Sequence, residues 1–405
     1  MQDNEKKPAL RFKGFTDPWE QRKLGEVADI VGGGTPSTSN PNYWDGDIDW
    51  YAPAEIAAQI YFDSSQRKIT EQGYENSSAK MLPPGTVLFT SRAGIGKTAI
   101  LSKKGCTNQG FQSIVPHNDE LDSYFVFSRT DELKQYGELV GAGSTFVEVS
   151  GKQMAAMNLK MPTTIEEQQT IGRFFKQLDT LITLHQRKYE KLVNIKKSML
   201  DKMFPKNGSS VPEIRFKGFT DPWEQRKVGE VAAVYDGVHQ TPDYTDSGVM
   251  FLSVENISTL RSEKYISETA FQRDYKVYPQ KGDILMTRIG DVGTPNVVET
   301  TEKVAFYVSL ALLKPFGIDS YFLNNAIQSP FFQEGLKERT LVTAIPQKIN
   351  KDEIGKVKIL LPESKQEQQQ IGKLCRELDT LITLHQRKLE KLQNIKKSCL
   401  EKMFV

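Results

Sequence analysis

The sequence is poor in the residues that carry disulfide and metal chemistry. Its 405 residues include three cysteines (Cys106, Cys375 and Cys399) and four histidines. An odd cysteine count without a C-x-x-C pair argues against both a disulfide framework and a cysteine-based zinc site. The H-E-x-x-H pattern of a zinc protease is also absent. We therefore expect a protein of a reducing compartment that holds no metal of its own.

Long hydrophobic runs and an excess of charge of one sign are missing too. No apolar segment approaches the roughly 18 residues of a membrane span, and residues 1–10 lack the basic-then-apolar pattern of a secretory signal. With 53 Lys and Arg against 51 Asp and Glu, the formal net charge is only +2. That balance excludes a wholly basic nucleic-acid coat but leaves room for local basic surfaces. We expect a cytoplasmic protein, and the length suggests two or three domains.

The chain contains an internal repeat. Residues 11–30 (RFKGFTDPWEQRKLGEVADI) recur at 215–234 with differences only at positions 24, 29 and 30 of the first copy. Residues 178–198 recur at 378–398 with two differences. The intervening segments share only short echoes, such as GTVLFT at 85–90 with GDILMT at 282–287. Sequence drift after an old duplication does not explain why the repeated blocks stayed nearly identical while the segments between them diverged. We therefore favour one repeated scaffold whose two divergent segments recognise different targets.

The second constant block predicts a long helix in each copy. Prolines precede it, the sequences at 164–167 and 364–367 have the capping-box pattern, and about forty residues would make a rod of roughly 60 Å. Apolar residues recur at the three- and four-residue steps of a coiled coil. In the first copy this stripe contains Ile171, Leu178, Leu181, His185, Leu192 and Ile195, and in the second Leu378, Leu381, His385, Leu392 and Ile395. Since a narrow stripe needs a partner helix, we predict an intramolecular antiparallel coiled coil.

Two features of these helices allow more than one interpretation. His185 and His385 lie on the stripe with no carboxylate or second histidine at ligand spacing, so we interpret them as residues of the helix pair rather than metal ligands. The last half of the first helix is basic, with seven Lys and Arg between positions 185 and 206. This row is either a solvated face or a surface along which a duplex lies, because phosphates attract such rows without sequence preference.

The divergent segments 31–163 and 235–363 predict compact mixed α/β domains. Short β-rich runs occur at 87–90, 284–287 and 304–308, and helical patterns occur at 321–327 and 332–337. Loops at 31–37 and 236–242 occupy matching places and end in a Thr-Pro step. Arg and Gln near them are the side chains best shaped for base edges, although ordinary loop polarity is the alternative for any single residue.

No catalytic constellation is present. The sequence GIGKT at 94–98 resembles the end of a P-loop, but Ser91 stands where the pattern needs its first glycine. The D-P-W at 17–19 and 221–223 resembles an amino-methyltransferase motif without its second proline, and we interpret it as a hydrophobic anchor. We therefore predict no catalytic residue, no metal site and no cofactor bound by this chain.

Taken together, these motifs resemble the specificity subunit of type I restriction–modification enzymes. The resemblance rests on D-P-W-E-Q-R-K-x-G-E-V in both copies, on E-Q-Q-x-I-G at 167–172 and 367–372, and on L-D-T-L-I-T-L-H-Q-R-K. It implies an α+β chain with two target recognition domains separated by two long helices in a pseudo-twofold arrangement. Each domain would read one half of a bipartite target in double-stranded DNA, and the helices would set the spacing.

The resemblance also implies a non-catalytic subunit. The helices would dock two modification (methyltransferase) subunits, and restriction (translocase and nuclease) subunits would join that core. S-adenosylmethionine, ATP and magnesium would be bound by these partners. The expected divisions are an arm at 1–17, a recognition domain at 18–163, a helical spacer at 164–206, a linker repeating the arm at 207–221, a second recognition domain at 222–363 and a second spacer at 364–405.

Position on the loops gives the candidate DNA contacts. In the first reader they are Thr35, Ser37, Ser91, Arg92, Lys97 and Thr98. In the second they are Gln240, Thr241, Tyr244, Arg288, Gln347 and Lys348, the last two standing opposite Val147 and Glu148 of the first copy. Two other classes remain open: a self-contained DNA methyltransferase or nuclease, and a coiled-coil adaptor that binds proteins at both ends.

Overall fold

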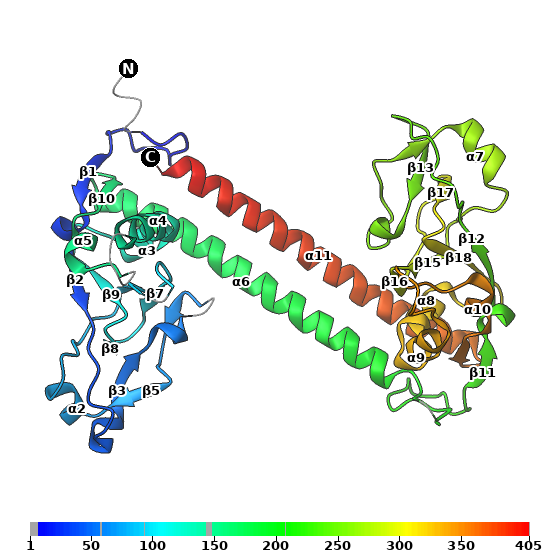
Figure 1. Cartoon of the computed structure of the whole chain (residues 1–405), viewed down its shortest axis with the longest axis horizontal. Coiled ribbons are helices and arrows are strands. Elements are labelled where there is room, and N and C mark those ends of the chain that lie inside the picture. Colours follow the sequence, from blue (N-terminus) through cyan, green and yellow to red (C-terminus); the bar gives the residue numbers. More distant parts are fainter. Residues whose placement is uncertain (1–6, 57–58, 93, 143–147, 207, 405) are drawn as a thin grey trace. The chain divides into compact units, whose positions relative to one another are not determined.

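The computed structural model describes residues 7–56, 59–92, 94–142, 148–206 and 208–404. The chain forms two compact units (Figure 1): unit 1 is Met1–His185 with Lys388–Val405, and unit 2 is Gln186–Arg387. Two long helices, α6 (Ile165–Lys202) and α11 (Lys365–Met403), give one half to each unit. The expected α+β architecture with two long helices is confirmed.

Unit 1 is a mixed α/β domain with a larger sheet of order β2-β9-β6-β7-β4 and a smaller one of order β5-β3-β8. Its strands are β2 (Ala28–Gly32), β3 (Trp44–Tyr51), β4 (Tyr61–Phe62), β5 (Arg67–Ile69), β6 (Val87–Phe89), β7 (Thr98–Leu101), β8 (Cys106–Thr107) and β9 (Gln112–Pro116). Its short helices are α1 (Leu24–Val27), α2 (Glu71–Glu75), α3 (Ser123–Ser128), α4 (Thr130–Gly141) and α5 (Gly151–Ala155). Val87, Phe89 and Ile114 of the larger sheet share one buried cluster with Phe125 and Leu133 of α3 and α4.

Unit 2 has a four-stranded sheet of order β12-β18-β15-β16 and a three-stranded sheet of order β14-β13-β17. Its strands are β12 (Ala232–Asp236), β13 (Val249–Leu252), β14 (Tyr265–Ile266), β15 (Ile284–Ile289), β16 (Asp291–Val297), β17 (Val304–Phe306) and β18 (Leu310–Pro315). Its helices are α7 (Glu268–Asp274), α8 (Ser320–Gln328), α9 (Pro330–Arg339) and α10 (Lys351–Lys356). The strands and helices predicted in both inserts are therefore present.

The constant blocks build the same two-stranded frame in both units. β1 (Glu20–Lys23) pairs antiparallel with β10 (Asn158–Met161), and β11 (Glu224–Lys227) pairs with β19 (Lys358–Leu361). The register is the same, because Glu20 faces Met161 as Glu224 faces Leu361. The repeated E-Q-R-K sequence thus forms one structural element twice.

In the described parts of the segments expected as an arm and a linker, Arg11 and Arg215 bind the units. In unit 1, Nε and Nη2 of Arg11 each lie 2.7 Å from a different oxygen of Glu167, and Nε1 of Trp19 is 3.4 Å from that carboxylate. Arg215, Trp223 and Glu367 repeat this arrangement in unit 2, at 2.7, 2.8 and 3.4 Å. The repeated R-F-K-G-F-T-D-P-W block therefore ties the frame to the start of each long helix.

This arrangement corrects the predicted capping boxes. The carboxylates of Glu167 and Glu367 bind arginine and tryptophan instead of returning to the backbone that precedes their helices. The Ser364 hydroxyl still accepts a bond from the Glu367 amide, at 3.4 Å. A two-pronged, charge-assisted pair with arginine is stronger than a single neutral bond at a helix end, so the tertiary contact takes these carboxylates.

Gln168 and Gly172 account for the rest of the E-Q-Q-x-I-G sequence. Oε1 of Gln168 accepts from the Asp122 amide at 3.1 Å, and Oδ1 of Asp122 caps α3 by accepting from the Phe125 amide at 2.8 Å. A Cβ on Gly172 would lie 2.5 Å from Oδ1 of Asp122, so only glycine allows α3 this close to α6. Gln368, Asp319, Phe322 and Gly372 repeat these contacts in unit 2.

Within each unit, the two half-helices lie side by side and run antiparallel. In unit 1, Nζ of Lys396 is 2.6 Å from Oδ1 of Asp179, and the ring of Phe175 stacks on Phe404 with centroids 5.7 Å apart. In unit 2, Nζ of Lys196 is 2.6 Å from Oδ1 of Asp379. The start of one helix thus lies against the end of the other in both units, and the predicted antiparallel pairing is confirmed.

Part of the predicted helix stripe lies outside the seam. Ile171, Leu178 and Leu378 are buried, and Leu192, Leu392 and both stripe histidines are half-buried. Leu181, Ile195, Leu381 and Ile395 are 43%, 37%, 42% and 37% exposed, because two straight helices cover a narrower face than the predicted stripe. Within the described part of the chain, no helix is both long and apolar enough to span a membrane.

Candidate nucleic-acid interface

The predicted contact residues of unit 1 gather at one end of its larger sheet. β2 ends at Gly32, which pairs with Gln112 at the start of β9, and β6 ends at Phe89, which pairs with Thr98 at the start of β7. The loops 33–37 and 90–97 therefore leave the sheet at the same end, which we call the loop edge of unit 1. Adjacent ends of antiparallel strands bring residues far apart in sequence close together in this way.

The glycine-rich loop is fastened by two indoles. Nε1 of Trp50 donates to the Gly34 carbonyl at 2.8 Å, and Nε1 of Trp44 donates to the Ser37 carbonyl at 3.1 Å. The two rings pack edge to face with centroids 5.1 Å apart, and the Arg67 guanidinium lies 3.7 Å above the Trp44 ring. These tryptophans therefore support the loop backbone.

Glycine is required where this loop meets the rest of unit 1. A Cβ on Gly33 would lie 2.0 Å from the Asn108 carbonyl oxygen, and one on Gly34 would lie 2.3 Å from a backbone carbon of Ser78. The hydroxyl of Thr35 donates to Oε1 of Gln109. Ser37 is exposed, with its hydroxyl 2.8 Å from that of Ser39. The loop thus presents hydroxyl groups from a fixed backbone.

The second loop of this edge is a tight turn closed by Thr90. The Thr90 hydroxyl accepts from the Lys97 amide at 2.9 Å and donates to the Gly94 carbonyl at 2.7 Å, and the Thr90 carbonyl accepts from the Gly96 amide at 3.0 Å. Since Thr90 takes both amides, they are not free to cradle a phosphate as a P-loop does. Thr287 makes the matching bond to the Thr294 amide, at 2.9 Å, in unit 2.

The predicted residues of this turn divide into inner and outer ones. Arg92 is half-buried and Lys97 is exposed, and Nη1 of Arg92 lies 3.8 Å from Oε2 of Glu148. Ser91 is fully buried, and Thr98 is 8% exposed with its hydroxyl 2.6 Å from that of Thr130. Ser91 and Thr98 therefore serve the packing of unit 1. Val147 lies outside the described residues.

In unit 2 the loop edge consists of residues 237–244, 288–291 and 341–348. β12 ends at Asp236, directly before the first segment, and β15 leads into the second. The Gly290 amide donates to the Gln347 carbonyl at 2.8 Å, which ties the third segment to the second. Gln240, Thr241, Tyr244, Gln347 and Lys348 are all exposed there, so the fold brings five of the six predicted residues to one surface.

Arg288 is the exception because it is buried, and its contact with DNA stays a prediction. It is 5% exposed, its Nη1 pairs with Oδ1 of Asp236, and its Nε is buried without a partner among the described residues. Burial lowers the pKa of this guanidinium. Its backbone also links β15 to Ser309 and Ile349. The sequence shows no signal for this pair, because Asp236 lies 52 positions away.

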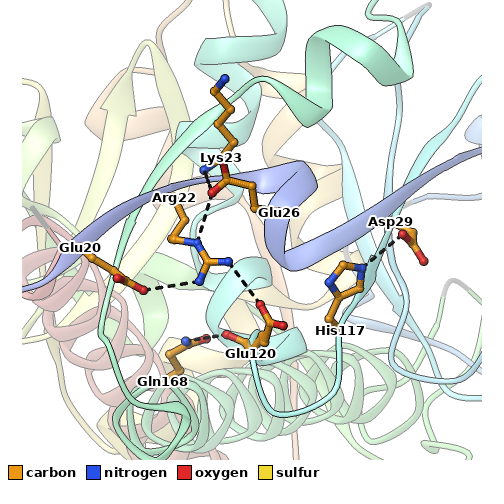
Figure 2. Close-up of polar contacts among 8 residues, drawn as sticks. All are labelled: Glu20, Arg22, Lys23, Glu26, Asp29, His117, Glu120 and Gln168. Carbon is orange, nitrogen blue, oxygen red and sulfur yellow. Dashed lines mark hydrogen bonds and ion pairs between the residues drawn. The ribbon is translucent and has the colours of Figure 1, made fainter.

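The other end of the larger sheet of unit 1 is acidic (Figure 2). There, Arg22 of β1 lies 3.6, 3.2 and 3.4 Å from carboxylate oxygens of Glu20, Glu26 and Glu120, and Nε2 of His117 is 3.2 Å from Oδ1 of Asp29. Asp29, His117, Asp119 and Asp122 line a cavity of about 870 Å³ at this end. The carboxylates repel phosphates, whereas Arg67, Arg92 and Lys97 belong to the loop edge and its support. Charge thus favours the loop edge as the side that meets a nucleic acid.

The helices carry a second surface. In unit 1, Leu181 and Leu184 are 43% and 45% exposed, and in unit 2 Leu381 and Leu384 are 42% and 44% exposed. These are identical residues at identical positions of the repeat, and large apolar side chains exposed in pairs mark an interaction surface. No group of three or more His, Cys, Asp or Glu residues is placed to hold a metal within the described ranges.

Comparisons with known proteins identify the family of this chain. The family model for the type I restriction modification DNA specificity domain matches residues 16–194 and 220–394. The MjaIX type I restriction enzyme specificity subunit of Methanocaldococcus jannaschii is 31% identical over 274 residues, which are 64% of this chain and 63% of that protein. The MjaVIII specificity subunit of the same organism is 22% identical over 399 residues, covering 94% of this chain and 91% of the relative.

A solved structure shows the same fold. The crystal structure of the S subunit of a type I restriction–modification system from M. genitalium superposes with a TM-score of 0.69 at 15% sequence identity, covering 98% of this chain and 99% of that chain. The two family matches fall on the two repeats and include both loop edges. The chain therefore belongs to the type I restriction modification DNA specificity family, with one family domain in each repeat.

Proposed function

We propose that each unit reads one half of a bipartite target in double-stranded DNA through its loop edge. The observation that supports this is the contrast inside the chain. The frame contacts of Arg11, Trp19 and Glu167 are repeated at Arg215, Trp223 and Glu367, whereas the loop edges share almost no residues. The two units thus have the same frame contacts but different loop edges. This is the arrangement expected if the two loop edges recognise different DNA sequences.

The chemistry of the loop edges suits base recognition. The first edge offers the hydroxyl of Ser37 and the cations of Arg92 and Lys97, and the second offers the amides and ammonium of Gln240, Gln347 and Lys348. Amide and guanidinium groups make paired bonds to adenine and guanine edges in the major groove, and lysine binds guanine or phosphate. Ser91, Thr98 and Arg288 act in our proposal as internal supports.

We further propose that the half-helices of each unit dock one modification subunit, so that one chain binds two. The exposed pairs Leu181–Leu184 and Leu381–Leu384 supply matching apolar surfaces. Restriction subunits would join this assembly, with S-adenosylmethionine, ATP and magnesium bound by the partners. The chain itself would be non-catalytic, and it would bind DNA in the cytoplasm.

Two of the seven cations in the basic segment 185–206 already have carboxylate partners, which favours a solvated face over a duplex path for these two. Lys196 is paired with Asp379 at 2.6 Å, and Lys206 lies 3.1 and 2.9 Å from Asp201 and Glu213. Cations that already have carboxylate partners release fewer counterions from DNA and contribute less to binding.

A reader swap tests the proposed function. Residues 31–163 are replaced by the corresponding segment of another family member, and the methylated motif is determined genome-wide in cells that supply the modification subunits. We expect one half of the motif to change and the other half to stay. A matched control replaces 178–198 by the sequence of 378–398, which alters only Tyr189 and Val193 and should leave both halves unchanged.

Two outcomes would contradict the proposal. If swapping 31–163 altered both halves of the motif or neither, the units would not be independent readers. If the purified chain alone methylated or cleaved DNA in the presence of S-adenosylmethionine or magnesium, it would be an enzyme in its own right.

A further inference from the structure

The two most exposed large apolar side chains described in unit 2, Val342 and Ile345, lie with Leu341 on one small loop, residues 341–348, which we call the apolar finger. Leu341, Val342 and Ile345 are 47%, 62% and 101% exposed. Exposed apolar residues scattered singly are normal on a protein surface, but three within five positions at a loop tip are not. The finger needs an explanation outside the packing of unit 2.

The finger is held firmly at its base. Leu341 and Lys348 exchange backbone bonds of 2.8 and 3.4 Å, an isolated bridge that closes the loop between them. Gln347 is bonded to Gly290 twice, through its carbonyl at 2.8 Å and through Nε2 at 3.0 Å. The Ile349 amide donates to the Arg288 carbonyl at 3.0 Å. An apolar tip on a fixed base is prepared for contact, since little conformational freedom is left to lose on binding.

Three observations indicate which partner the finger fits. It belongs to the loop edge of unit 2, beside the exposed side chains of Gln347 and Lys348. Three side chains on one loop offer far less than the roughly 800 Å² that each partner buries in a stable protein interface. The major groove of DNA admits an α-helix or a two-stranded ribbon and so has room for this closed loop, and the thymine C5 methyl is the apolar group on its base edges. The polar side chains at the base of the finger therefore match the hydrogen-bonding groups of the base edges, and its apolar tip matches the thymine methyl groups.

We propose that the apolar finger enters the major groove of the half-site read by unit 2 and places Val342 and Ile345 against thymine methyl groups. This inference rests on the proposed function. It makes the apolar finger a specificity-determining element that recognises A·T pairs by apolar contact, next to the hydrogen bonds offered by Gln347 and Lys348. Gln347 and Lys348 were candidates from their position in the sequence, whereas Leu341, Val342 and Ile345 were not.

The test combines a change in the protein with a change in the DNA. Val342→Ser/Ile345→Ser is made in the full chain assembled with its modification subunits, and affinity is measured by fluorescence anisotropy on the motif found by methylome sequencing. The same motif is also made with deoxyuridine in place of each thymidine of the second half-site, which removes only the methyl groups. Phe316→Ser is the matched control, because Phe316 is 51% exposed and follows β18 at the opposite end of the same sheet.

We expect the finger variant to bind the normal motif about tenfold more weakly than the wild type, with unchanged affinity for unrelated DNA. Uracil substitution should weaken the wild type to a similar extent and leave the finger variant unaffected. The Phe316→Ser control should respond to uracil as the wild type does.

Equal sensitivity of wild type and finger variant to uracil would overturn the inference, as would a second half-site without an A·T pair. Loss of a bound modification subunit from the finger variant would instead make the finger a protein contact. A wild-type complex that prefers no sequence would overturn the proposed function itself.

Discussion

Single side chains decide how the loop edge of unit 2 is held. Arg288 and Asp236 join the end of β15 to the end of β12, directly before the loop 237–244. The side chain of Arg288 is only 6% exposed, and that of Asp236 is 23% exposed. Removing one partner of a buried pair leaves an uncompensated charge, whereas replacing both by apolar groups is often harmless.

We predict that Asp236→Ala lowers the stability of the chain by roughly 3 kcal/mol. The double variant Asp236→Ala/Arg288→Met should recover most of that loss, because no charge is left buried. Urea unfolding of both single variants and the double variant measures the coupling. Additive losses, with no recovery in the double variant, would mean that the pair does not hold the edge.

The cysteines give a second prediction at this scale. Burial raises the pKa of the Cys106 thiol to about 12 and that of Cys375 to about 11, and both side chains are enclosed. Because the thiolate is the reactive form, iodoacetamide at pH 8 should leave these two unmodified in the folded chain. Cys399 is half-buried and should react slowly, and all three should react in urea. Peptide mass spectrometry measures this, and rapid labelling of Cys106 in the folded chain would contradict its burial.

At the scale of elements, the repeated helix start is a packing device. Gly172 and Gly372 admit the capping aspartates Asp122 and Asp319, which would lie 2.5 and 2.6 Å from an added Cβ. Alanine is otherwise the better helix former by about 1 kcal/mol. The two effects oppose each other, and the steric one is larger because its neighbours are fixed by hydrogen bonds to the Phe125 and Phe322 amides.

We predict that Gly172→Ala and Gly372→Ala each destabilise the chain by about 1–3 kcal/mol. Gly355→Ala in α10 is the matched control, since nothing lies within 4 Å of its added Cβ, and it should stabilise by about 0.5–1 kcal/mol. Thermal unfolding of the three variants separates packing from helix propensity. If all three were stabilising, the close approach of α3 and α8 would not constrain these glycines.

Much of the element pattern follows from the sequence. The prolines, the capping pattern and the periodic stripe predict two long helical segments at 164–206 and 364–405, and the helices are α6 at Ile165–Lys202 and α11 at Lys365–Met403. The short β-rich runs give β6, β15 and β17, because consecutive buried apolar residues leave few alternatives. The local sequence pattern predicts a helix or strand well where the spacing of its own apolar residues determines which face is buried.

Long-range pairing is what the sequence does not reveal. Glu167 fits a capping box by spacing, but its partner Arg11 lies 156 positions away. Arg288 has the side chain of a base reader, yet Asp236 holds it inside the sheet. In each case a charged group finds a buried partner through the fold, and that tertiary bond is stronger than the local one. The loops that carry the candidate residues could be identified from the sequence, whereas their meeting at one end of each sheet and the exposure of their side chains required coordinates.

At the scale of the whole molecule, the family resemblance implies that the helices set the gap between half-sites, and we extend our proposal to this role. Seven extra residues lengthen a helix by about 10 Å and keep its faces in register to within about 20°. DNA rises about 3.4 Å per base pair, so about 10 Å corresponds to roughly three base pairs.

We therefore predict that a seven-residue helical insertion after His185 together with one after Arg387 widens the gap of the methylated motif by about three base pairs and leaves both half-sites unchanged. A five-residue insertion at both places turns the helix faces by about 140° and should abolish methylation. Methylome sequencing measures both outcomes. An unchanged gap with the seven-residue insertions would mean that the helices do not set the spacing.

The indole bonds of Trp44 and Trp50 end on carbonyl oxygens of the loop 33–37 and leave its side chains untouched. Substituting Ser37 thus alters what the loop displays without removing either indole bond. The exposed side chains of such a loop can therefore change by single substitutions during evolution, because the indole bonds to the backbone hold the loop in each intermediate sequence.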